Sequence, residues 1–232
     1  MKLSVLIPAS GSGARFGANV PKQFALLGGR HILHQTILAF AEMEIVDEII
    51  VAVPPGFSQT VADYGVAKLA RIVEGGASRL DTVSRALGVV AHDTDYVFIH
   101  DGVRPFITEA FVNDVLNAVR EHGAAIACAP VTDTIKRAGA SNIIEETCDR
   151  SSLWQAQTPQ GFTYKIIMNA YSQPGLNAIP ATDDSSLVER LGVPVHIVPN
   201  TRVNMKITTP EDLLIAEAIW GSFKGALLEC EK

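Results

Sequence analysis

The sequence predicts an α/β fold, a doubly wound and mostly parallel sheet with a protruding β-arm. Five short apolar runs show little alternation of apolar and polar residues, as buried parallel strands do. Stretches with helical spacing of apolar residues lie between these runs, and this βαβα order predicts right-handed crossovers. Ligands of such sheets bind beyond the carboxyl ends of the strands. The predicted strands are Leu3–Pro8, Glu48–Val53, Ala70–Val73, Tyr96–His100 and Ala124–Ala129.

The helices between these strands are predicted from spacing and from their first residues. Ile32–Ala41 spaces its apolar residues at helical intervals, and Ser78–Val90 and Thr108–Glu121 each begin with a hydroxyl residue suited to an N-cap. Further elements are expected in the last third of the chain: helices at Tyr164–Tyr171, Ser185–Leu191 and Pro210–Trp220, and a strand at Val195–Val198.

Residues 130 to 157 interrupt the alternation. Pro130–Arg137 and Asn142–Trp154 are polar and extended in character, and they flank the turn sequence Ala-Gly-Ala-Ser at 138–141. We therefore predict a β-arm at about residues 130–157. The 232 residues favour one domain, residues 1–232, that carries this arm.

Composition excludes several classes of protein. A net charge of −6 disfavours a chain that coats nucleic acid. No apolar run reaches the roughly eighteen residues that cross a bilayer, so no membrane partner is expected. Met1–Pro8 is interpreted as the first strand and not as a secretory signal. The three widely spaced cysteines include no CxxC pair, which favours the reducing cytoplasm.

The loop after the first strand carries the strongest functional signal. It reads PASGSGARF from Pro8 to Phe16, and Pro21-Lys22-Gln23 follows. Glycines let backbone N–H groups approach phosphate oxygens. The loop lacks the P-loop pattern, and Phe16 stands where a dinucleotide fingerprint needs glycine, which disfavours a nicotinamide dehydrogenase.

Two cations belong to the same loop. Arg15 and Lys22 beside a polyphosphate would supply the fixed positive charge that nucleotidyl transfer requires. The alternative is that both are ordinary surface charges and that the glycines only shape a turn.

A carboxylate follows the fourth predicted strand. Asp101 comes directly after Tyr96–His100, so it is expected at the ligand edge of the sheet, where a hard oxygen ligand suits Mg²⁺ or another divalent cation. The alternative is that Asp101 caps the next turn. Gly75 and Gly76, before the helix that begins at Ser78, offer backbone donors and a positive helix end.

Taken together, these motifs resemble a known family. The pattern GxGxRx₅PKQ resembles the signature loop of sugar-phosphate nucleotidyltransferases, and the later segments resemble, in order, the motifs of the 2-C-methyl-D-erythritol 4-phosphate cytidylyltransferases. These later segments are EGGASRLDTV at 74–83, HDGVRP at 100–105, DTIKR at 133–137, Asp149-Arg150, WQAQTPQ at 154–160, Thr182-Asp183-Asp184 and NMKIT at 204–208.

The resemblance implies a Rossmann-like nucleotidyltransferase fold and a reaction. CMP from CTP is transferred to 2-C-methyl-D-erythritol 4-phosphate, a sugar-alcohol phosphate, which gives 4-diphosphocytidyl-2-C-methyl-D-erythritol and pyrophosphate in the non-mevalonate isoprenoid pathway. The acceptor phosphate is already an anion at neutral pH, so no general base is needed. The family's arm crosses to a second subunit, so a homodimer is expected.

The resemblance also implies roles for individual residues. Arg15 and Lys22 would be catalytic, and Asp101 would bind the metal. Nucleotide-binding roles fall on Pro8, Ala9, Ser10, Gly11, Gly13, Gly76, Thr82 and Asp101. Acceptor-binding roles fall on Arg104, Thr134, Arg150, Thr158 and Lys206.

The sequence departs from the family at three places. Ala77 replaces an acidic residue, Ser10 replaces an alanine, and Gly102-Val103 replaces a pair of alanines. These departures put details of base recognition in doubt more than catalysis.

Two other functions remain open. A ribitol 5-phosphate cytidylyltransferase would share the nucleotide loops and differ in acceptor contacts. A non-catalytic nucleotide-binding module would keep the fold without turnover. Two side-chain pairs receive no special role: His31 and His34 are interpreted as helix-surface or packing residues, and Asp183 and Asp184 as helix-capping residues with no part in proton transfer.

Overall fold

The structure is a computed structural model that describes residues 1–11, 16, 20–173 and 181–230, the last six of them by backbone only. Its central sheet has seven strands in the order β11-β7-β10-β6-β1-β4-β5. The strands are β1 (Leu3–Pro8), β4 (Glu48–Val53), β5 (Leu69–Glu74), β6 (Tyr96–Ile99), β7 (Ala124–Pro130), β10 (Trp154–Thr163) and β11 (His196–Pro199).

All pairings but those of β10 are parallel, which confirms the predicted fold class. Strand β10 runs antiparallel between β6 and β7. It was not predicted, because its residues 154–160 are mostly polar and lack a strand pattern. The expectation that Ala70–Val73 forms a buried strand was wrong in one respect: β5 is an edge strand in which Ala70 and Arg71 are exposed.

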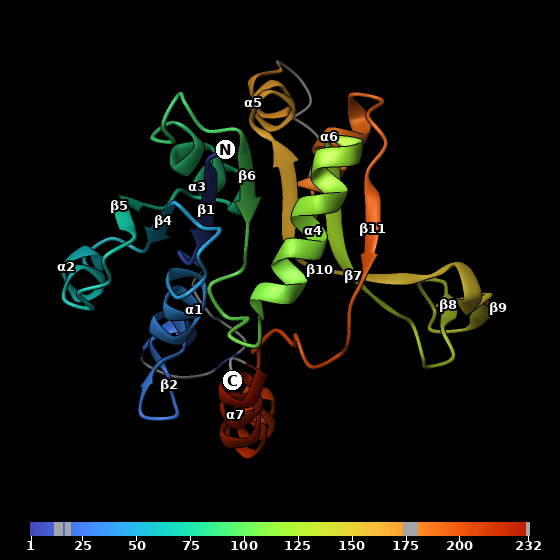
Figure 1. Ribbon diagram of the computed structural model, residues 1–232. Helices are drawn as coiled ribbons and strands as arrows, with labels where there is room; N and C mark the ends of the chain where they lie inside the picture. The colour runs from blue at the N-terminus through green and yellow to red at the C-terminus, as the bar shows by residue number, and fades with distance from the viewer. Residues whose placement is uncertain (12–15, 17–19, 174–180, 231–232) are drawn as a thin grey trace.

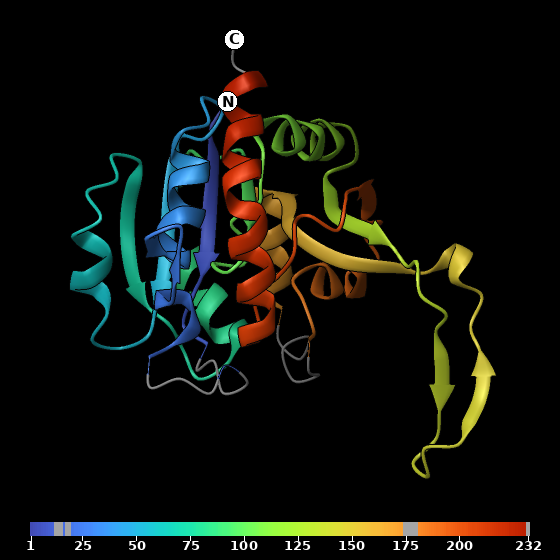
Figure 2. The same ribbon diagram turned by 90° about the horizontal axis from the view of Figure 1, so that it is seen from below.

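Helices cover both faces of the sheet (Figures 1 and 2). On one face α1 (Ile32–Ala41) and α4 (Glu109–His122) pack on alternate strand residues, and α3 (Arg79–Leu87), α5 (Tyr164–Ser172) and α6 (Ser185–Arg190) pack on the other. In β1, Val5 faces the first layer and Leu6 the second. Burial on both faces explains why the strand sequences do not alternate.

The predicted helix starts are confirmed. The Ser78 side chain accepts a hydrogen bond from the Asp81 N–H at the start of α3, and Thr108 does the same for the Phe111 N–H at the start of α4.

Smaller elements complete the body of the protein. A short hairpin of β2 (Leu26–Leu27) and β3 (Arg30–His31) packs against α7 (Pro210–Cys230), around the buried side chains of Leu27 and Trp220. Helix α2 (Ser58–Ala62) contacts β5, and the 3₁₀ turns η2 (Lys22–Phe24) and η3 (Arg150–Ser152) precede β2 and β10. In the part of the chain that the structure describes, no helix has the length and apolarity needed to cross a membrane.

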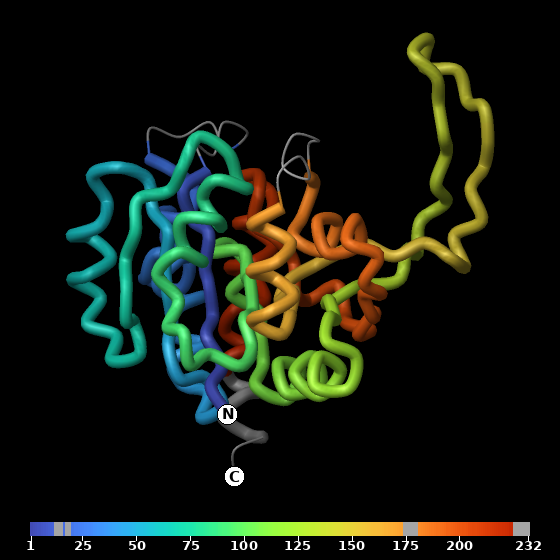
Figure 3. The backbone as a smooth tube through the Cα atoms, turned by 90° about the horizontal axis from the view of Figure 1, so that it is seen from above, coloured from blue at the N-terminus to red at the C-terminus, as the bar shows by residue number. Residues whose placement is uncertain are grey.

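The β-arm is a separate two-stranded antiparallel sheet of β8 (Lys136–Ala138) and β9 (Ile144–Thr147). It projects from the body beyond the ends of β7 and β10 (Figures 2 and 3). Its strands are shorter than the two predicted segments, because Trp154 already belongs to the central sheet and pairs with Pro130.

Candidate active site

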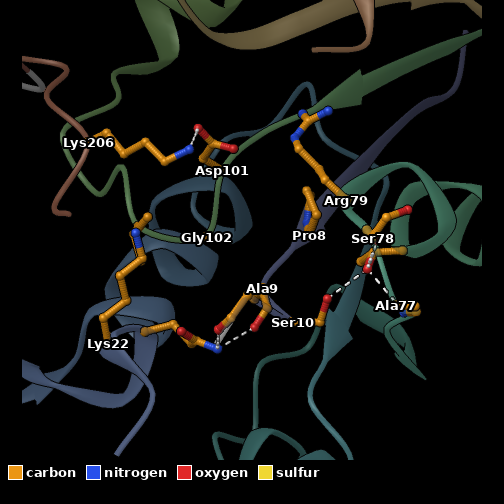
Figure 4. Close-up of a pocket in the computed structure, with 15 residues that line it drawn as sticks. Pro8, Ala9, Ser10, Lys22, Ala77, Ser78, Arg79, Asp101, Gly102 and Lys206 are labelled. Atoms are coloured by element: carbon orange, nitrogen blue, oxygen red, sulfur yellow. Dashed lines mark hydrogen bonds and ion pairs between the residues drawn. The ribbon is translucent and has the colours of Figure 1, made fainter. Parts of the chain in front are cut away.

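A cleft of about 430 Å³ opens at the carboxyl ends of β1, β5 and β6, the sheet edge where the topology predicts ligands. Figure 4 shows Lys22 on one side of this cleft and Ser78 and Arg79 on the other. The lining residues are Pro8, Ala9, Ser10, Gly11, Lys22, Gln23, Gly76, Ala77, Ser78, Arg79, Thr82, Asp101, Gly102, Val103 and Lys206.

The glycine loop is tied to the turn that carries Lys22. The Gln23 amide nitrogen donates to the carbonyl of Ala9 at 2.6 Å and to that of Gly11 at 3.3 Å, and its side chain is buried. Lys22 is therefore held beside the loop by its neighbour in the chain. The predicted residues Gly13 and Arg15 lie outside the described residues.

A hydroxyl network shapes the opposite wall. The Thr82 hydroxyl donates to the Ser78 carbonyl at 2.8 Å and accepts from the Gly76 N–H at 3.0 Å. Ser10 therefore donates its own proton to Thr82, at 2.7 Å. A Cβ on Gly75 would lie 2.1 Å from the Ser10 Cβ, so this close approach requires glycine.

Ala77 stands where the family has an acidic residue, but a nearby residue of this chain, Asp81, places a carboxylate next to it. The Ala77 N–H donates to the Asp81 carboxylate at 3.0 Å. This hydrogen bond, with those from Arg85, lowers the pKa of Asp81. A Cβ on Gly76 would overlap the same carboxylate, so Asp81 lies directly against the predicted nucleotide loop.

Asp101 lies at the centre of a cationic cluster. One of its carboxylate oxygens, Oδ2, is 2.9 Å from the Lys206 ammonium and 3.2 Å from Arg104 Nε. Burial alone would raise the pKa of Asp101, but the charges of Lys206, Arg104 and Arg79 hold it well below its ordinary value. The carboxylate is therefore ionised at neutral pH and is too weak a base to accept a proton there.

A second hollow of about 200 Å³ adjoins the cleft and shares Arg79, Asp101 and Lys206 with it. Three of the predicted acceptor-binding residues line it: Arg104, Thr158 and Lys206. Its lining residues are Arg79, Asp101, Arg104, Ala156, Gln157, Thr158, Gln160, Thr182, Asp183 and Lys206.

A buried histidine holds the Asp101–Arg104 turn in place. The Asp101 N–H donates to Thr158 Oγ1 at 3.1 Å, the Thr158 hydroxyl donates to His100 Nδ1 at 3.1 Å, and His100 Nε2–H donates to the Arg104 carbonyl at 2.9 Å. The register of β10 shifts between Ala156 and Gln160, and Thr158 lies within this irregularity.

This arrangement predicts an acid-labile fold. Burial lowers the pKa of His100 from its ordinary value of 6.5 to about 4. The unfolded chain therefore binds a proton below pH 6.5 that the folded chain refuses until about pH 4, so stability falls as the pH drops through this window. Urea denaturation in metal-free buffer measures how far the free energy of unfolding drops between pH 7.5 and pH 4.5. We expect this drop to be about 2.5 kcal/mol smaller in His100→Gln than in the wild type. Equal losses in both proteins would contradict this assignment.

The remaining predicted acceptor residues lie on the arm. Thr134 precedes β8 and Arg150 begins η3, and neither lines the cleft or the hollow of the same chain. The Arg150 guanidinium donates to the Thr132 carbonyl within the arm. Within one chain, the other described candidates all line the cleft or the smaller hollow, and Thr134 and Arg150 do not.

The two histidines and one of the two aspartates that were given no catalytic role have the structural roles expected of them. His31 Nδ1 lies 2.9 Å from the Tyr64 hydroxyl and His34 stacks on the Tyr64 ring, so both pack as expected. Asp183 caps α6 by accepting from the Ser186 N–H at 3.1 Å. Asp184 makes no such cap, and its carboxylate instead pairs with Arg79.

The model of the family described as 2-C-methyl-D-erythritol 4-phosphate cytidylyltransferase matches residues 3–222 of the chain. The chain belongs to this family. It is 42% identical to the 2-C-methyl-D-erythritol 4-phosphate cytidylyltransferase of Syntrophus aciditrophicus, over 97% of this chain and 99% of that protein. It is 41% identical to the Pelotomaculum thermopropionicum protein of the same name, over 98% of each.

Solved structures of the family share the fold. The cytidylyltransferase from Thermus thermophilus superposes with a TM-score of 0.78 at 35% identity, over 94% of this chain and 98% of that one. The 4-diphosphocytidyl-2C-methyl-D-erythritol synthase from Anaerococcus prevotii gives a TM-score of 0.82 at 29% identity, over 95% and 98%. The predicted family and fold are thereby confirmed.

Two residues of the site were missed from sequence. Gln23 lies beside Lys22 and holds the glycine loop, and Arg79 borders both hollows. A signal existed for Arg79, because a cation in the first turn of a helix opposes the helix dipole and needs another reason to be there.

Proposed function

We propose that this protein transfers CMP from CTP to the phosphate of 2-C-methyl-D-erythritol 4-phosphate, with release of pyrophosphate. The observation that supports this proposal is the shared wall of the two hollows. The cleft formed by the glycine loop and the start of α3 continues into a smaller, cation-rich hollow, and Asp101 and Lys206 border both. Two anionic substrates bound in these hollows would meet at that wall.

The nucleotide is assigned to the larger cleft. Backbone N–H groups around Gly11 and the start of α3 suit its phosphates. Gly76 and the Ser10–Thr82 hydroxyl pair form the part of the cleft that we assign to the base and ribose.

The chemistry asks for positioning and charge neutralisation. A phosphate oxygen of the acceptor attacks the α-phosphorus of CTP, a P–O bond forms, and the bond to the pyrophosphate oxygen breaks. Lys22, together with Arg15, is proposed to stabilise the negative charge that grows on the α-phosphate. Arg104 and Lys206 are proposed to hold the acceptor, with no proton transfer required.

Asp101 is the residue we propose as a ligand for Mg²⁺ or another divalent cation. Within the described residues its Oδ1 has no hydrogen-bond partner, and Asp101 is the one acidic residue that lines the larger cleft. One carboxylate with substrate phosphates is a common way to hold Mg²⁺, so the residues fit the ion. The ion would supply positive charge beside the triphosphate when bound.

A homodimer would bring the arm residues to the site. The arm exposes Ile143 and Ile144, and its two short strands have free edges that favour cover by another chain. We propose that Thr134 and Arg150 of one copy contact the acceptor in the other copy. The protein is expected in the cytoplasm, which suits the free thiols of Cys128 and Cys148.

Substrate identity is tested by pyrophosphate release. Purified protein with CTP and Mg²⁺ should release pyrophosphate with 2-C-methyl-D-erythritol 4-phosphate and much less with ribitol 5-phosphate. Faster release with ribitol 5-phosphate would overturn the acceptor. CTP binding without release in either case would favour a non-catalytic module.

The shared site is tested by mixing two inactive variants. Arg150→Ala damages the arm, and Lys206→Ala damages the hollow that we propose receives the partner's arm. If two copies build each site, unfolding and refolding an equal mixture should restore about a quarter of wild-type activity, because half of the dimers are mixed and each mixed dimer has one intact site. Recovery to no more than the sum of the separate variants would contradict a site built from two chains.

A further inference from the structure

An ion pair between Arg79 at the start of α3 and the buried carboxylate of Asp184 joins two parts of the chain that are 105 residues apart. Arg79 Nη1 donates to Asp184 Oδ1 at 2.9 Å, and Arg79 Nη2 donates to Oδ2 at 2.5 Å. Asp184 has no exposed surface, and the Tyr171 hydroxyl donates to its Oδ1 at 2.6 Å. The Asp184 N–H in turn donates to the Gln160 side chain at 3.0 Å. Both carboxylate oxygens of Asp184 therefore accept hydrogen bonds, and its backbone is held by Gln160.

Local structure gives no reason for this pair. Arg79 is the first residue of α3, where the helix dipole disfavours a cation. Asp184 precedes α6 yet leaves its capping to Asp183. A buried carboxylate is also costly to desolvate and seldom adds net stability. The arrangement instead fixes the direction of a guanidinium.

The guanidinium is presented to the site. Arg79 borders both the cleft and the smaller hollow, and about 32% of its side chain is exposed. Its bonds to Asp184 use one N–H on each terminal nitrogen, which leaves three of the five N–H groups uncommitted within the described residues. Figure 4 shows the guanidinium at the same end of the cleft as Asp101 and Lys206.

We propose that Asp184 is a positioning residue: it holds the Arg79 guanidinium at the junction of the two hollows, where its uncommitted N–H groups bind anionic phosphate oxygens of the substrates. This inference rests on the proposed function for its kinetic consequence. Asp184 itself touches no substrate and acts through Arg79. The charge of Arg79 already reaches this junction, since it contributes to lowering the pKa of Asp101.

The proposal predicts strong coupling between the two residues. We compare the wild type, Asp184→Asn, Arg79→Met and the double variant, with the acceptor varied at saturating CTP. Each single variant should lower kcat/KM about tenfold or more, as misplaced binding groups do. The double variant should be no slower than Arg79→Met alone, because Asp184 has nothing left to position. Multiplying losses would overturn the proposal.

A second readout excludes a purely structural role. Guanidinium at millimolar concentration should partly restore Arg79→Ala, since Asp184 still offers its bidentate carboxylate. The same addition should fail with Arg79→Ala/Asp184→Asn. Equal rescue of both proteins would contradict the assignment. Arg71→Met serves as the matched control: it removes an exposed arginine on β5 that bonds only to its neighbour's carbonyl among the described contacts, and it should keep wild-type constants.

Two further measurements distinguish failure of the positioning role from misfolding of a variant and from failure of the proposed function. If Asp184→Asn does not fold, Tyr171→Phe replaces it: this change removes one hydrogen bond to Asp184 and should slow the wild type but not the Arg79→Met protein. If the wild type itself releases no pyrophosphate, the proposed function fails. The same four proteins are then compared by CTP titration calorimetry, where fold-changes in Kd that multiply in the double variant would overturn the positioning role.

Discussion

Lys22→Ala is expected to lower kcat about a hundredfold while the protein folds normally. Removing one donor that stabilises charge in a transition state typically costs this much. The turn that carries Lys22 is held by other groups, because Gln23 bonds the glycine loop and Phe24 stacks on Phe57 with 4.3 Å between ring centroids. The loss should therefore appear in pyrophosphate release and not in the thermal unfolding midpoint.

The matched control for this substitution is Lys165→Ala. Lys165 is exposed on α5, outside the residues that line either hollow, so its loss changes net charge equally without touching the site. Lys165→Ala should keep the wild-type rate. Near wild-type turnover in Lys22→Ala would remove the electrostatic basis of the proposed mechanism.

Asp101→Asn is expected to lower kcat/KM by up to about a thousandfold, the upper end of what one preorganised charge contributes. Asparagine keeps the shape of the side chain but loses the charge that pairs with Lys206 and Arg104. The cleft then becomes more positive, so metal-free CTP should bind at least as tightly as it does to the wild type. The gain in CTP affinity on adding Mg²⁺ should be lost.

Calorimetric CTP titrations with and without Mg²⁺ separate these two effects. Asp114→Asn, at an exposed position on α4, is the control for loss of one carboxylate. If Mg²⁺ raises the CTP affinity of the Asp101→Asn protein as much as it raises that of the wild type, another residue holds the metal.

Much of the fold could be predicted because its signals are local. Leu3–Pro8, Glu48–Val53 and Ile32–Ala41 have the predicted bounds, and Ser78 and Thr108 cap the helices that they were expected to cap. Each of these signals depends on residues within one or two turns of chain. The glycine loop, Lys22 and Asp101 were found in the same way, since each follows a recognisable strand.

The errors concern partners far apart in sequence. Strand β10 pairs with β6 on one side and with β7 on the other, and its mostly polar residues 154–160 carry no strand pattern of their own. Asp184 was expected to cap a helix, as its sequence context suggests. Its real partner, Arg79, is 105 residues away, so no local pattern could identify the pair.

The sequence by itself determined the α/β class, the cytidylyltransferase family and several of the side chains that line the larger cleft, among them Lys22 and Asp101. Only the tertiary structure decided which cations surround Asp101, how His100 and Thr158 hold that turn, and that Arg79 is fixed from behind by Asp184. The reason is physical: strand and helix signals are set by neighbouring residues, whereas a charge in a site has the direction and the pKa that its packed surroundings impose.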